Sequence, residues 1–315
     1  MMQAIQVENP GSDYRLILGE ISRPAPGKNE VLIRIAAAGI NHADMLQARG
    51  HYPPPPGAPA TLGMEVSGEI VELGEGVEGL ANGMRVCALL AGGGYAAFAT
   101  ASAFCVLPVP DKIDLVDAAG LPEAFFTVWT NLMDSAQLKP GESVLIHGGS
   151  SGIGAAAIQI CATRGHKVFT TAGSAEKCTA CEGLGARAIN YRDTDFVEAV
   201  RRETDGRGVD VILDMVGGDY IQRNMAAAAL WGRIVNIAYL KGASAQVNFA
   251  PMLAKRLSLL ATTLRGRSPA EKGAIRDALA REVWPLLAEG RIVPVVDSRF
   301  PLAEAQQAHT RMASS

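Results

Sequence analysis

The stretch that decides the fold is His147-Gly148-Gly149-Ser150-Ser151-Gly152-Ile153-Gly154-Ala155. The apolar run Ser143–His147 precedes the glycines, and the small and apolar residues of Ala155–Arg164 follow them. A short Val/Ile/Leu-rich run predicts a buried strand, and the longer run after the glycines predicts a helix. The sequence therefore predicts a strand, a tight glycine loop and a helix, in that order.

A loop of this kind is suited to holding an anion. Its glycines permit a tight turn and let backbone N–H groups approach a pyrophosphate, while the helix N-terminus adds unpaired donors and a positive dipole end. We therefore expect a dinucleotide site whose pyrophosphate contacts are Ser150, Ser151, Gly152 and Ile153. The alternative is a strand–helix turn that binds no ligand.

The end of the following strand, Lys167–Thr171, distinguishes the two nicotinamide cofactors. NAD-binding proteins usually place an acidic residue there to hold the ribose 2′-hydroxyl. Here Gly173 and Ser174 occupy the strand end, and Lys177 follows one helical turn later. A 2′-phosphate would meet a hydroxyl and a cation, so we predict NADPH. An inward-turned Glu176 would weaken this preference, and Lys177 taken alone has the alternative of a solvated helix lysine.

From about Ala118 onward, helical and strand patterns alternate. The expected strands are Ser143–His147, Lys167–Thr171, Ala188–Asn190, Val209–Asp214, Arg233–Ala238 and Leu257–Thr263. The expected helices are Leu121–Ala136, Ala155–Arg164, Ala175–Leu184, Phe196–Glu203, Tyr220–Leu230 and a long stretch, Pro269–Glu289. Such alternation predicts the α/β class, with a parallel sheet covered on both faces.

The first 120 or so residues have a different texture, rich in glycine and proline. Short β-type runs at Glu30–Ala36, Glu65–Leu73 and Arg85–Leu90 are separated by turn signals. This pattern predicts an irregular barrel or sandwich. Pro53-Pro54-Pro55-Pro56 predicts a stiff extended loop, since each proline fixes φ and removes a donor.

Composition excludes several classes of protein. The formal net charge of −3, with no long run of one sign, argues against a nucleic-acid-binding surface. No stretch of 18 or more apolar residues is present, so we expect no membrane span. Met1–Tyr14 lacks the basic start and apolar run of a signal peptide, which leads us to expect a cytoplasmic protein.

The five cysteines are odd in number and irregularly spaced, which argues against a disulfide framework. Cys178 and Cys181 form a C-x-x-C within an expected helix, with no second Cys/His pair nearby. We interpret them as two small helix residues, with metal or redox use as the alternative.

Several motifs together resemble the quinone oxidoreductase (zeta-crystallin-like) branch of the medium-chain dehydrogenase/reductase superfamily. The resemblance runs from about Ile5 to His309 and is greatest to the subgroup that includes the p53-inducible quinone oxidoreductase of animals. Besides the glycine loop, the matching segments are Ala38-Gly39-Ile40-Asn41-His42-Ala43-Asp44, Gly50-His51-Tyr52-Pro53-Pro54-Pro55, Leu62-Gly63-Met64-Glu65-Val66-Ser67-Gly68, Leu121-Pro122-Glu123-Ala124 and Ile189-Asn190-Tyr191.

The resemblance implies a GroES-like β-barrel catalytic domain at residues 1–120 and a Rossmann NADPH-binding domain at 121–260. Residues 261–315 would return to the catalytic domain, and the nicotinamide would lie in the cleft between the domains. It also implies a homodimer or homotetramer. Relatives continue beyond the Ala308-His309 region to a final strand, so this chain is either cut short or lacks one contact to the cofactor phosphate.

Zinc-dependent relatives carry a cysteine at the position of Asn41 and a histidine at that of Met64, and neither residue here is a normal zinc ligand. We therefore expect no metal; His42 and His51 lack a supporting ligand pattern. Without a Lewis acid an unactivated ketone is a poor substrate, whereas a quinone or an enone is already electrophilic. The expected reaction is hydride transfer from NADPH to a quinone.

The family pattern also assigns roles to single residues. It places Asn41 near the nicotinamide ribose and substrate, and Tyr52 at the pocket edge, where its phenol would donate to a developing oxyanion. The alternatives are a turn-stabilising asparagine and an aromatic loop anchor. The remaining implied cofactor contacts are Gly173, Ser174, Lys177 and Tyr191 at the 2′-phosphate, and Thr127, Val216, Ala238 and Leu264 at the nicotinamide. Thr127 also has the alternative of a plain helix threonine.

Two other functions remain open from the sequence. An NADPH-dependent 2-alkenal or enone reductase would use the same pocket chemistry. A non-enzymatic NADPH-binding protein, such as a redox sensor or RNA-associated module, is the other, although the absence of a basic patch argues against RNA.

Overall fold

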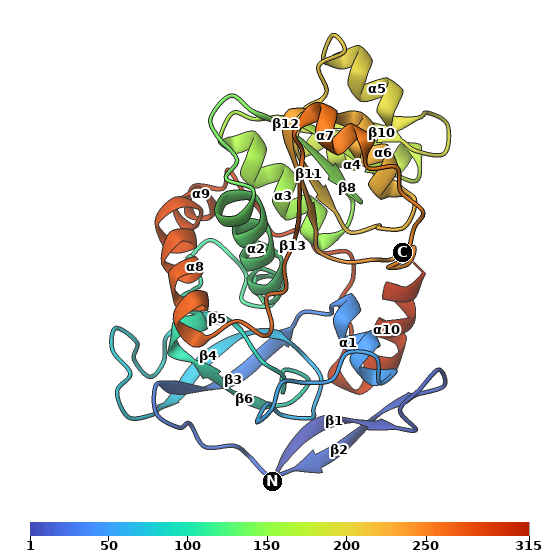
Figure 1. Ribbon diagram of the computed structural model, residues 1–315. Coiled ribbons are helices and arrows are strands. Elements are labelled where there is room, and N and C mark those ends of the chain that lie inside the picture. The colour runs from blue at the N-terminus through green and yellow to red at the C-terminus, as the bar shows by residue number, and fades with distance from the viewer. Residues whose placement is uncertain (315) are drawn as a thin grey trace. The chain divides into compact units, whose positions relative to one another are not determined.

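The computed structural model describes residues 1–314. The chain folds into two units: residues 1–126 together with those from 265 onward form the first, and Thr127–Leu264 form the second (Figure 1). Each unit has its own sheet and its own apolar core.

The second unit is built on a parallel six-stranded sheet. Its order is β10-β9-β8-β11-β12-β13, so the first strand of the unit, β8, lies at the centre. The chain adds β9 and β10 on one side of β8 and then crosses to add β11, β12 and β13 on the other side. The strands are β8 (Ser143–His147), β9 (Lys167–Ala172), β10 (Arg187–Asn190), β11 (Val209–Asp214), β12 (Ala228–Asn236) and β13 (Ser258–Ala261). This is the doubly wound order of dinucleotide-binding folds, whose ligands bind at the carboxyl ends of the strands. The predicted doubly wound parallel sheet is confirmed.

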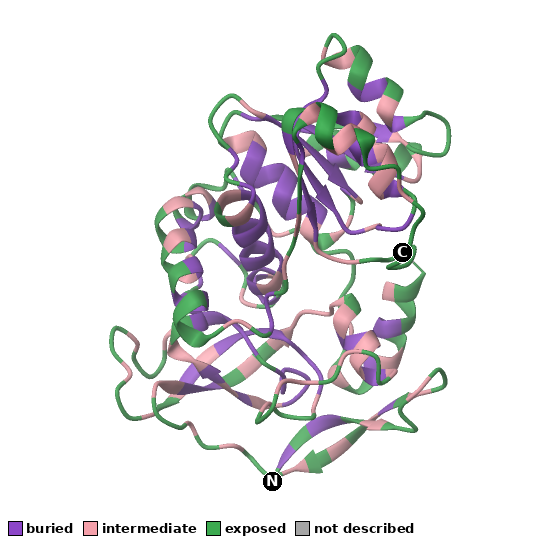
Figure 2. Ribbon diagram, viewed as in Figure 1, coloured by how far each residue is buried: buried purple, intermediate pink, exposed green. Residues whose placement is uncertain are grey.

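The central strands are buried on both faces because helices cover the sheet. Every residue of β8 and β11 is buried, as the burial colouring in Figure 2 shows. The helices of this unit include α3 (Gly152–Thr163), α4 (Ala175–Gly183), α5 (Phe196–Glu203), α6 (Tyr220–Ala227) and α7 (Ala250–Lys255). Leu145, Phe169 and Phe196 pack in one cluster under them, which explains the continuous apolar character of these strands.

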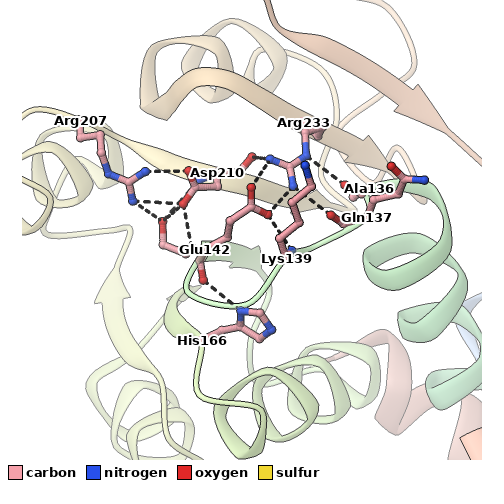
Figure 3. Close-up of polar contacts among 9 residues, drawn as sticks. Ala136, Gln137, Lys139, Glu142, His166, Arg207, Asp210 and Arg233 are labelled. Carbon is pink, nitrogen blue, oxygen red and sulfur yellow. Dashed lines mark hydrogen bonds and ion pairs between the residues drawn. The ribbon is translucent and has the colours of Figure 1, made fainter. Parts of the chain in front are cut away.

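The amino ends of the central strands are held together by an ion-pair network (Figure 3). Arg233 on β12 binds both carboxylate oxygens of Glu142, at 3.0 and 2.5 Å, and donates to the carbonyl of Ala136. Arg207 pairs with Asp210, whose carboxylate also accepts from the backbone and hydroxyl of Ser143. These bonds tie the loop before β8 to β11 and β12, at the edge of the sheet opposite the glycine loop.

The first unit contains a five-stranded antiparallel sheet and a separate hairpin. The sheet order is β6-β3-β4-β5-β7, and β1 pairs with β2 in the hairpin. The strands are β1 (Met2–Glu8), β2 (Arg15–Ile21), β3 (Glu30–Ala38), β4 (Glu65–Leu73), β5 (Arg85–Leu89), β6 (Phe98–Ser102) and β7 (Val106–Pro108). Alternate apolar residues such as Val31, Ile33 and Val66 form its core. Helices α1 (His42–Ala48), α8 (Pro269–Glu282), α9 (Trp284–Glu289) and α10 (Ala305–Ala313) complete the unit.

Three predicted helices differ from those observed. The helix expected at Leu121–Ala136 is α2 (Pro122–Val128) followed by a π-helical segment, Trp129–Ser135. The change occurs where the Asn131 side chain donates to the Thr127 carbonyl, which would otherwise accept a backbone N–H of the α-helix. The predicted helix Pro269–Glu289 breaks at Val283, since Pro285 has no N–H to continue α8.

The third difference is a competition between helix and strand. The helix expected at Tyr220–Leu230 ends at Ala227, and β12 begins at Ala228. From there the backbone pairs with β11 and β13 instead of continuing its helical bonds. Pairing in the sheet therefore overrides the local helical preference of this alanine-rich segment.

Across residues 1–314, none of the helices is both long and apolar enough to cross a membrane. All five cysteines are free thiols, and burial raises the pKa of both Cys178 and Cys181.

Candidate functional site

The glycine loop joins β8 to α3, and hydrogen bonds between its own residues fix its conformation. The hydroxyl of Ser151 donates to the Gly148 carbonyl at 2.7 Å and accepts from the Gly154 N–H at 3.0 Å. A Cβ on Gly154 would lie 2.3 Å from the Gly148 carbonyl oxygen, so only glycine permits this approach of helix and loop. Ser151 is therefore the N-cap that shapes the loop.

The loop leaves a small set of donors unused. No acceptor among residues 1–314 pairs with the backbone N–H groups of Ser150, Gly152 and Ile153, whereas both donors of Ser151 are taken by Gly148. These free N–H groups lie at the N-terminus of α3, where the helix dipole favours negative charge. The geometry thus suits an anion and places its contacts on the backbone.

The ends of β9 and β10 bring together the residues predicted for the 2′-phosphate. The Tyr191 N–H donates to the Ala172 carbonyl, and the Tyr191 hydroxyl lies 2.7 Å from where a Cβ on Gly173 would be. Ser174 caps α4 by accepting from the Lys177 N–H at 3.2 Å. The Lys177 side chain is exposed and forms no ion pair among the described residues. The cluster therefore offers two hydroxyls and a cation.

Two more predicted cofactor contacts lie at the carboxyl ends of β11 and β12. Val216 follows β11, and its carbonyl accepts from the Lys241 N–H at 2.8 Å. Ala238 follows β12, in the same half-buried turn region. Thr127, in α2, and Leu264, after β13, are buried, with exposed fractions of 7% and 8%. The predicted contacts in the second unit that follow its strands thus gather at one edge of one sheet.

In the first unit, Asn41 is held between two buried carboxylates. Its side-chain Nδ2 donates to Glu65 at 2.8 Å, and its backbone N–H donates to Asp44 at 2.9 Å. Glu65 also accepts from the Glu123 N–H, at the start of α2. Burial raises the pKa of Glu65 to about 8 and that of Asp44 to about 6. Asn41 is therefore oriented at both its backbone and its side chain.

Tyr52 lies in the loop after α1, half-buried beside Arg265. The Arg265 guanidinium lies over the Tyr52 ring, 5.2 Å from its centroid. Arg265 also donates to the Ala91 carbonyl and to Gln47, yet its buried Nη1 has no hydrogen-bond partner among residues 1–314. Burial raises the pKa of Tyr52, so its phenol is protonated near neutral pH. Together these two residues present hydrogen-bond donors.

A second chain of hydrogen bonds reaches Asp44 from the other side. Tyr95 donates to Asp44 at 3.2 Å and lies 3.1 Å from Nε2 of His309, whose Nδ1 is 2.8 Å from the Tyr14 hydroxyl. Burial lowers the pKa of His309 to about 4, so its ring is neutral and donates from one nitrogen only. Helix α10 is thereby connected to the N-cap of α1.

The donor groups around Asn41 do not fit a zinc ion. The oxygens of Asp44 accept from Asn41, Gly63 and Tyr95, and those of Glu65 accept from Asn41 and Glu123. Among residues 1–314 no three His, Cys, Asp or Glu side chains are grouped to hold a metal. Asparagine and methionine at positions 41 and 64 are also not zinc ligands.

Sequence reasoning missed several residues of this arrangement. The sequence indicates Glu65 only as part of a family motif, and it assigns no role to Arg265 or His309. The signal that the sequence offered for Glu65 is an acid in an otherwise apolar strand start, Met64-Glu65-Val66, since an acid among apolar residues is buried only when it is paired. The pairing of Arg265 with Tyr52 joins residues far apart in the chain and leaves no local pattern.

Comparisons with known proteins agree with this geometry. Residues 27–111 match the family of the alcohol dehydrogenase GroES-like domain, and residues 152–280 match the family described as zinc-binding dehydrogenase. The GroES-like character predicted for the first domain is confirmed. The chain is 31% identical to a quinone oxidoreductase of Rattus norvegicus, over 98% of this chain and 93% of that one.

Solved structures show the same likeness over the whole chain. The CurK enoyl reductase matches with a TM-score of 0.87 and 29% identity, covering 99% of this chain and 96% of that one. The Escherichia coli quinone oxidoreductase complexed with NADPH matches with a TM-score of 0.85 and 29% identity, covering 100% and 97%.

Proposed function

Given that the chain belongs to the quinone oxidoreductase family of the medium-chain dehydrogenase/reductase superfamily, and is thus an oxidoreductase, we propose that it reduces quinones with NADPH. The observation that carries the proposal is the glycine loop at the centre of a doubly wound sheet, with three N–H groups at the start of α3 that no described residue pairs with. In folds of this type that position binds a dinucleotide pyrophosphate.

The residues at the end of β9 favour NADPH over NADH. Gly173 and Ser174 stand where NAD-binding proteins carry an acid, and Lys177 and Tyr191 add a cation and a phenol. The similar Escherichia coli enzyme was solved with NADPH, which supports the same choice. Bound NADPH supplies a hydride; the protein's part is to hold it and to orient the acceptor.

For the acceptor, we propose that Tyr52 and Arg265 bind the oxygen on which negative charge develops. The Tyr52 phenol and the unpaired Nη1 of Arg265 are donors in one small region of the first unit. Such donors stabilise an oxyanion without a metal, in keeping with the absence of a zinc-type ligand set among the described residues. Quinones suit this arrangement because they need little activation.

An enone or 2-alkenal reductase is the second candidate. The likeness to the CurK enoyl reductase favours it, at the same identity as the quinone oxidoreductase of Escherichia coli. Reduction of an enone also places negative charge on an oxygen, so Tyr52 and Arg265 would serve both reactions.

We also propose that the protein is a homodimer or homotetramer, joined at the edge strand of the parallel sheet. β13 is the last strand of the sheet and leaves one side unpaired. Large apolar side chains in this region are exposed, among them Trp231 at 62%, Leu253 at 86% and Leu259 at 41%. An exposed apolar sheet edge of this kind is suited to pairing with a second copy.

The test is a panel of acceptors with each nicotinamide cofactor. We expect oxidation of NADPH by 1,4-benzoquinone and 9,10-phenanthrenequinone, with NADH much less effective. Faster turnover of 2-alkenals than of any quinone would select the second candidate. Tight NADPH binding with neither reaction would select a non-enzymatic role, and no affinity for either nucleotide would overturn the proposal.

A further inference from the structure

The buried carboxylate of Asp214, the last residue of β11, lies at the centre of a polar network beneath the strand ends. Four donors reach its two oxygens. The N–H groups of Val216 and Gly217 bind Oδ1 at 2.7 and 3.2 Å, and Asn224 and Asn236 bind Oδ2 at 3.0 and 2.9 Å. No charged donor is among them, so neutral groups alone solvate this charge.

One arm of the network runs from Asp214 to the glycine loop. Asn224 Oδ1 lies 2.8 Å from Nε2 of His147, and Nδ1 of His147 lies 3.0 Å from the Thr171 hydroxyl. The same hydroxyl accepts from the Gly148 N–H at 3.3 Å. Gly148 is the first residue of the loop, so the arm ends on the loop itself.

The directions of these bonds follow from the chemistry of each group. Because Asn224 donates its Nδ2 to Asp214, its Oδ1 must accept from His147 Nε2–H. Burial lowers the pKa of His147, so the ring is neutral and its Nδ1 accepts from Thr171. Every hydrogen in the arm therefore points toward the Asp214 carboxylate, and the Nε2–H tautomer of His147 is selected.

A second arm runs from Asp214 to the π-helical segment. The backbone carbonyl of Asn236, whose side chain binds Asp214, accepts from the Thr262 N–H at 3.4 Å. The Thr262 hydroxyl donates to Asn131 Oδ1 at 2.7 Å. Asn131 Nδ2 then donates to the Thr127 carbonyl at 2.8 Å. Thr127 is among the residues expected at the nicotinamide.

We propose that Asp214 is a positioning residue for the cofactor, and that its network sets the glycine loop, the Val216 turn and the Thr127 segment in one geometry. The proposal deepens the function proposed above and rests on it. Val216 is held directly, Gly148 through Asn224, His147 and Thr171, and Thr127 through Asn236, Thr262 and Asn131. The contacts expected for the pyrophosphate and for the nicotinamide of a bound dinucleotide thus both depend on one carboxylate.

The substitution Asp214→Asn tests this with little change in shape. An amide at this position cannot accept from all four donors, because its NH₂ would face either the N–H groups of Val216 and Gly217 or the NH₂ groups of Asn224 and Asn236. We expect the Kd for NADPH to rise about tenfold or more, and kcat with 1,4-benzoquinone to fall about tenfold, since small shifts of bound reactants are costly. Asp219→Asn, at an exposed position five residues later, is the matched control and should leave both unchanged.

Thr171→Val is the milder variant, in case Asp214→Asn does not fold. It keeps the side-chain volume and removes only the hydroxyl that joins His147 to the Gly148 N–H. We expect a rise of about fivefold in the Kd for NADPH, because both bonds of this hydroxyl are lost and they hold the loop rather than the ligand itself. The exchange D214N/N224D returns a carboxylate to the network, now directly beside His147, and should recover part of the affinity.

A spectroscopic measurement separates this network from the cofactor proposal. The ¹⁵N chemical shifts of His147, assigned by their loss in His147→Gln, should show the Nε2–H tautomer in the wild type and a mixture in Asp214→Asn. If the wild type shows this tautomer but binds no NADPH, the proposed function fails and the network stands. A folded Asp214→Asn protein with wild-type Kd, kcat and His147 tautomer would overturn the inference.

Discussion

The guanidinium of Arg265 lies over the ring of Tyr52, 5.2 Å from its centroid, although 212 positions separate the two residues in the chain. Burial raises the pKa of the Tyr52 phenol, and the Arg265 charge opposes that rise. The buried Nη1 of Arg265 has no hydrogen-bond partner among the described residues, which is costly unless a ligand accepts from it. The pair therefore combines a protonated phenol, that of Tyr52, with an available hydrogen-bond donor, Nη1 of Arg265.

Tyr52→Phe should separate catalysis from cofactor binding. Loss of the phenol removes a donor to the developing oxyanion, and such donors contribute about 10²-fold. We expect kcat/KM for 1,4-benzoquinone to fall about 10²-fold, while the Kd for NADPH stays as in the wild type. If Tyr52 is only a loop anchor, both constants will remain at wild-type values.

Arg265→Lys should slow reduction of the acceptor for two reasons. It removes the guanidinium that lies over the Tyr52 ring, and it removes the Nη1 donor proposed to bind the acceptor oxygen. We expect about a tenfold loss of kcat/KM, because lysine keeps the charge but not the planar fork of donors. A double-mutant cycle with Tyr52→Phe measures the coupling of the two side chains. Losses that simply multiply in the double variant would contradict a shared role.

Lys177→Ala tests the cofactor choice. Removing the cation should raise the Kd for NADPH about tenfold and leave that for NADH nearly unchanged, because only NADPH carries the 2′-phosphate. Fluorescence titration with both nucleotides measures this difference, and Lys112→Ala on the first unit is a suitable control. Equal weakening of both nucleotides would refute the assignment to the 2′-phosphate.

The sequence predicts an element correctly where the residues that determine it lie within that element. Strands β8, β11 and β4 were predicted to the residue or nearly so, because Val/Ile/Leu runs bounded by glycine leave little ambiguity. The helix expected to reach Leu230 instead stops at Ala227, since pairing with β11 and β13 decides that segment. Long-range partners cannot be read from local composition.

The same distinction applies to the candidate site. The glycine loop and the strand end at Gly173 were found because their chemistry is written in consecutive residues. The links from His309 to Asp44 and from Arg265 to Tyr52 join segments more than 200 positions apart. Asp214 carries no signal of its own, because an acid at the end of a strand is equally suited to a turn.

The buried ring of His309 should make stability depend on acid. Its pKa is lowered to about 4 from an ordinary 6.5, mainly by burial, with the Arg49 charge adding to the effect. At this residue the unfolded chain therefore binds more protons between these values, so the contribution of His309 to stability is full above about pH 6.5 and falls toward pH 4. A shift of this size corresponds to about 3 kcal/mol.

His309→Gln should remove that acid dependence. We expect a lower melting temperature at pH 7, because the bonds to Tyr14 and Tyr95 are lost, but a smaller decline between pH 6.5 and 4 than in the wild type. Thermal unfolding across this range, with the exposed His51→Gln as control, measures the difference. Parallel curves for wild type and His309→Gln would show that this ring does not carry the effect.

The ion pair between Glu142 and Arg233 should affect stability without affecting the cofactor. The pair is largely buried, and Arg233 binds both carboxylate oxygens (Figure 3). Glu142→Gln leaves the guanidinium short of its charged partner and should cost about 2 kcal/mol, which lowers the melting temperature by roughly 4 to 8 °C. Because this network lies at the amino ends of β8 and β11, opposite the glycine loop, the Kd for NADPH should not change. Glu182→Gln, on the exposed face of α4, is the matched control. If the Kd for NADPH is raised in folded Glu142→Gln, the two edges of the sheet are coupled. The positioning role assigned to Asp214 would then be shared by the whole of β11.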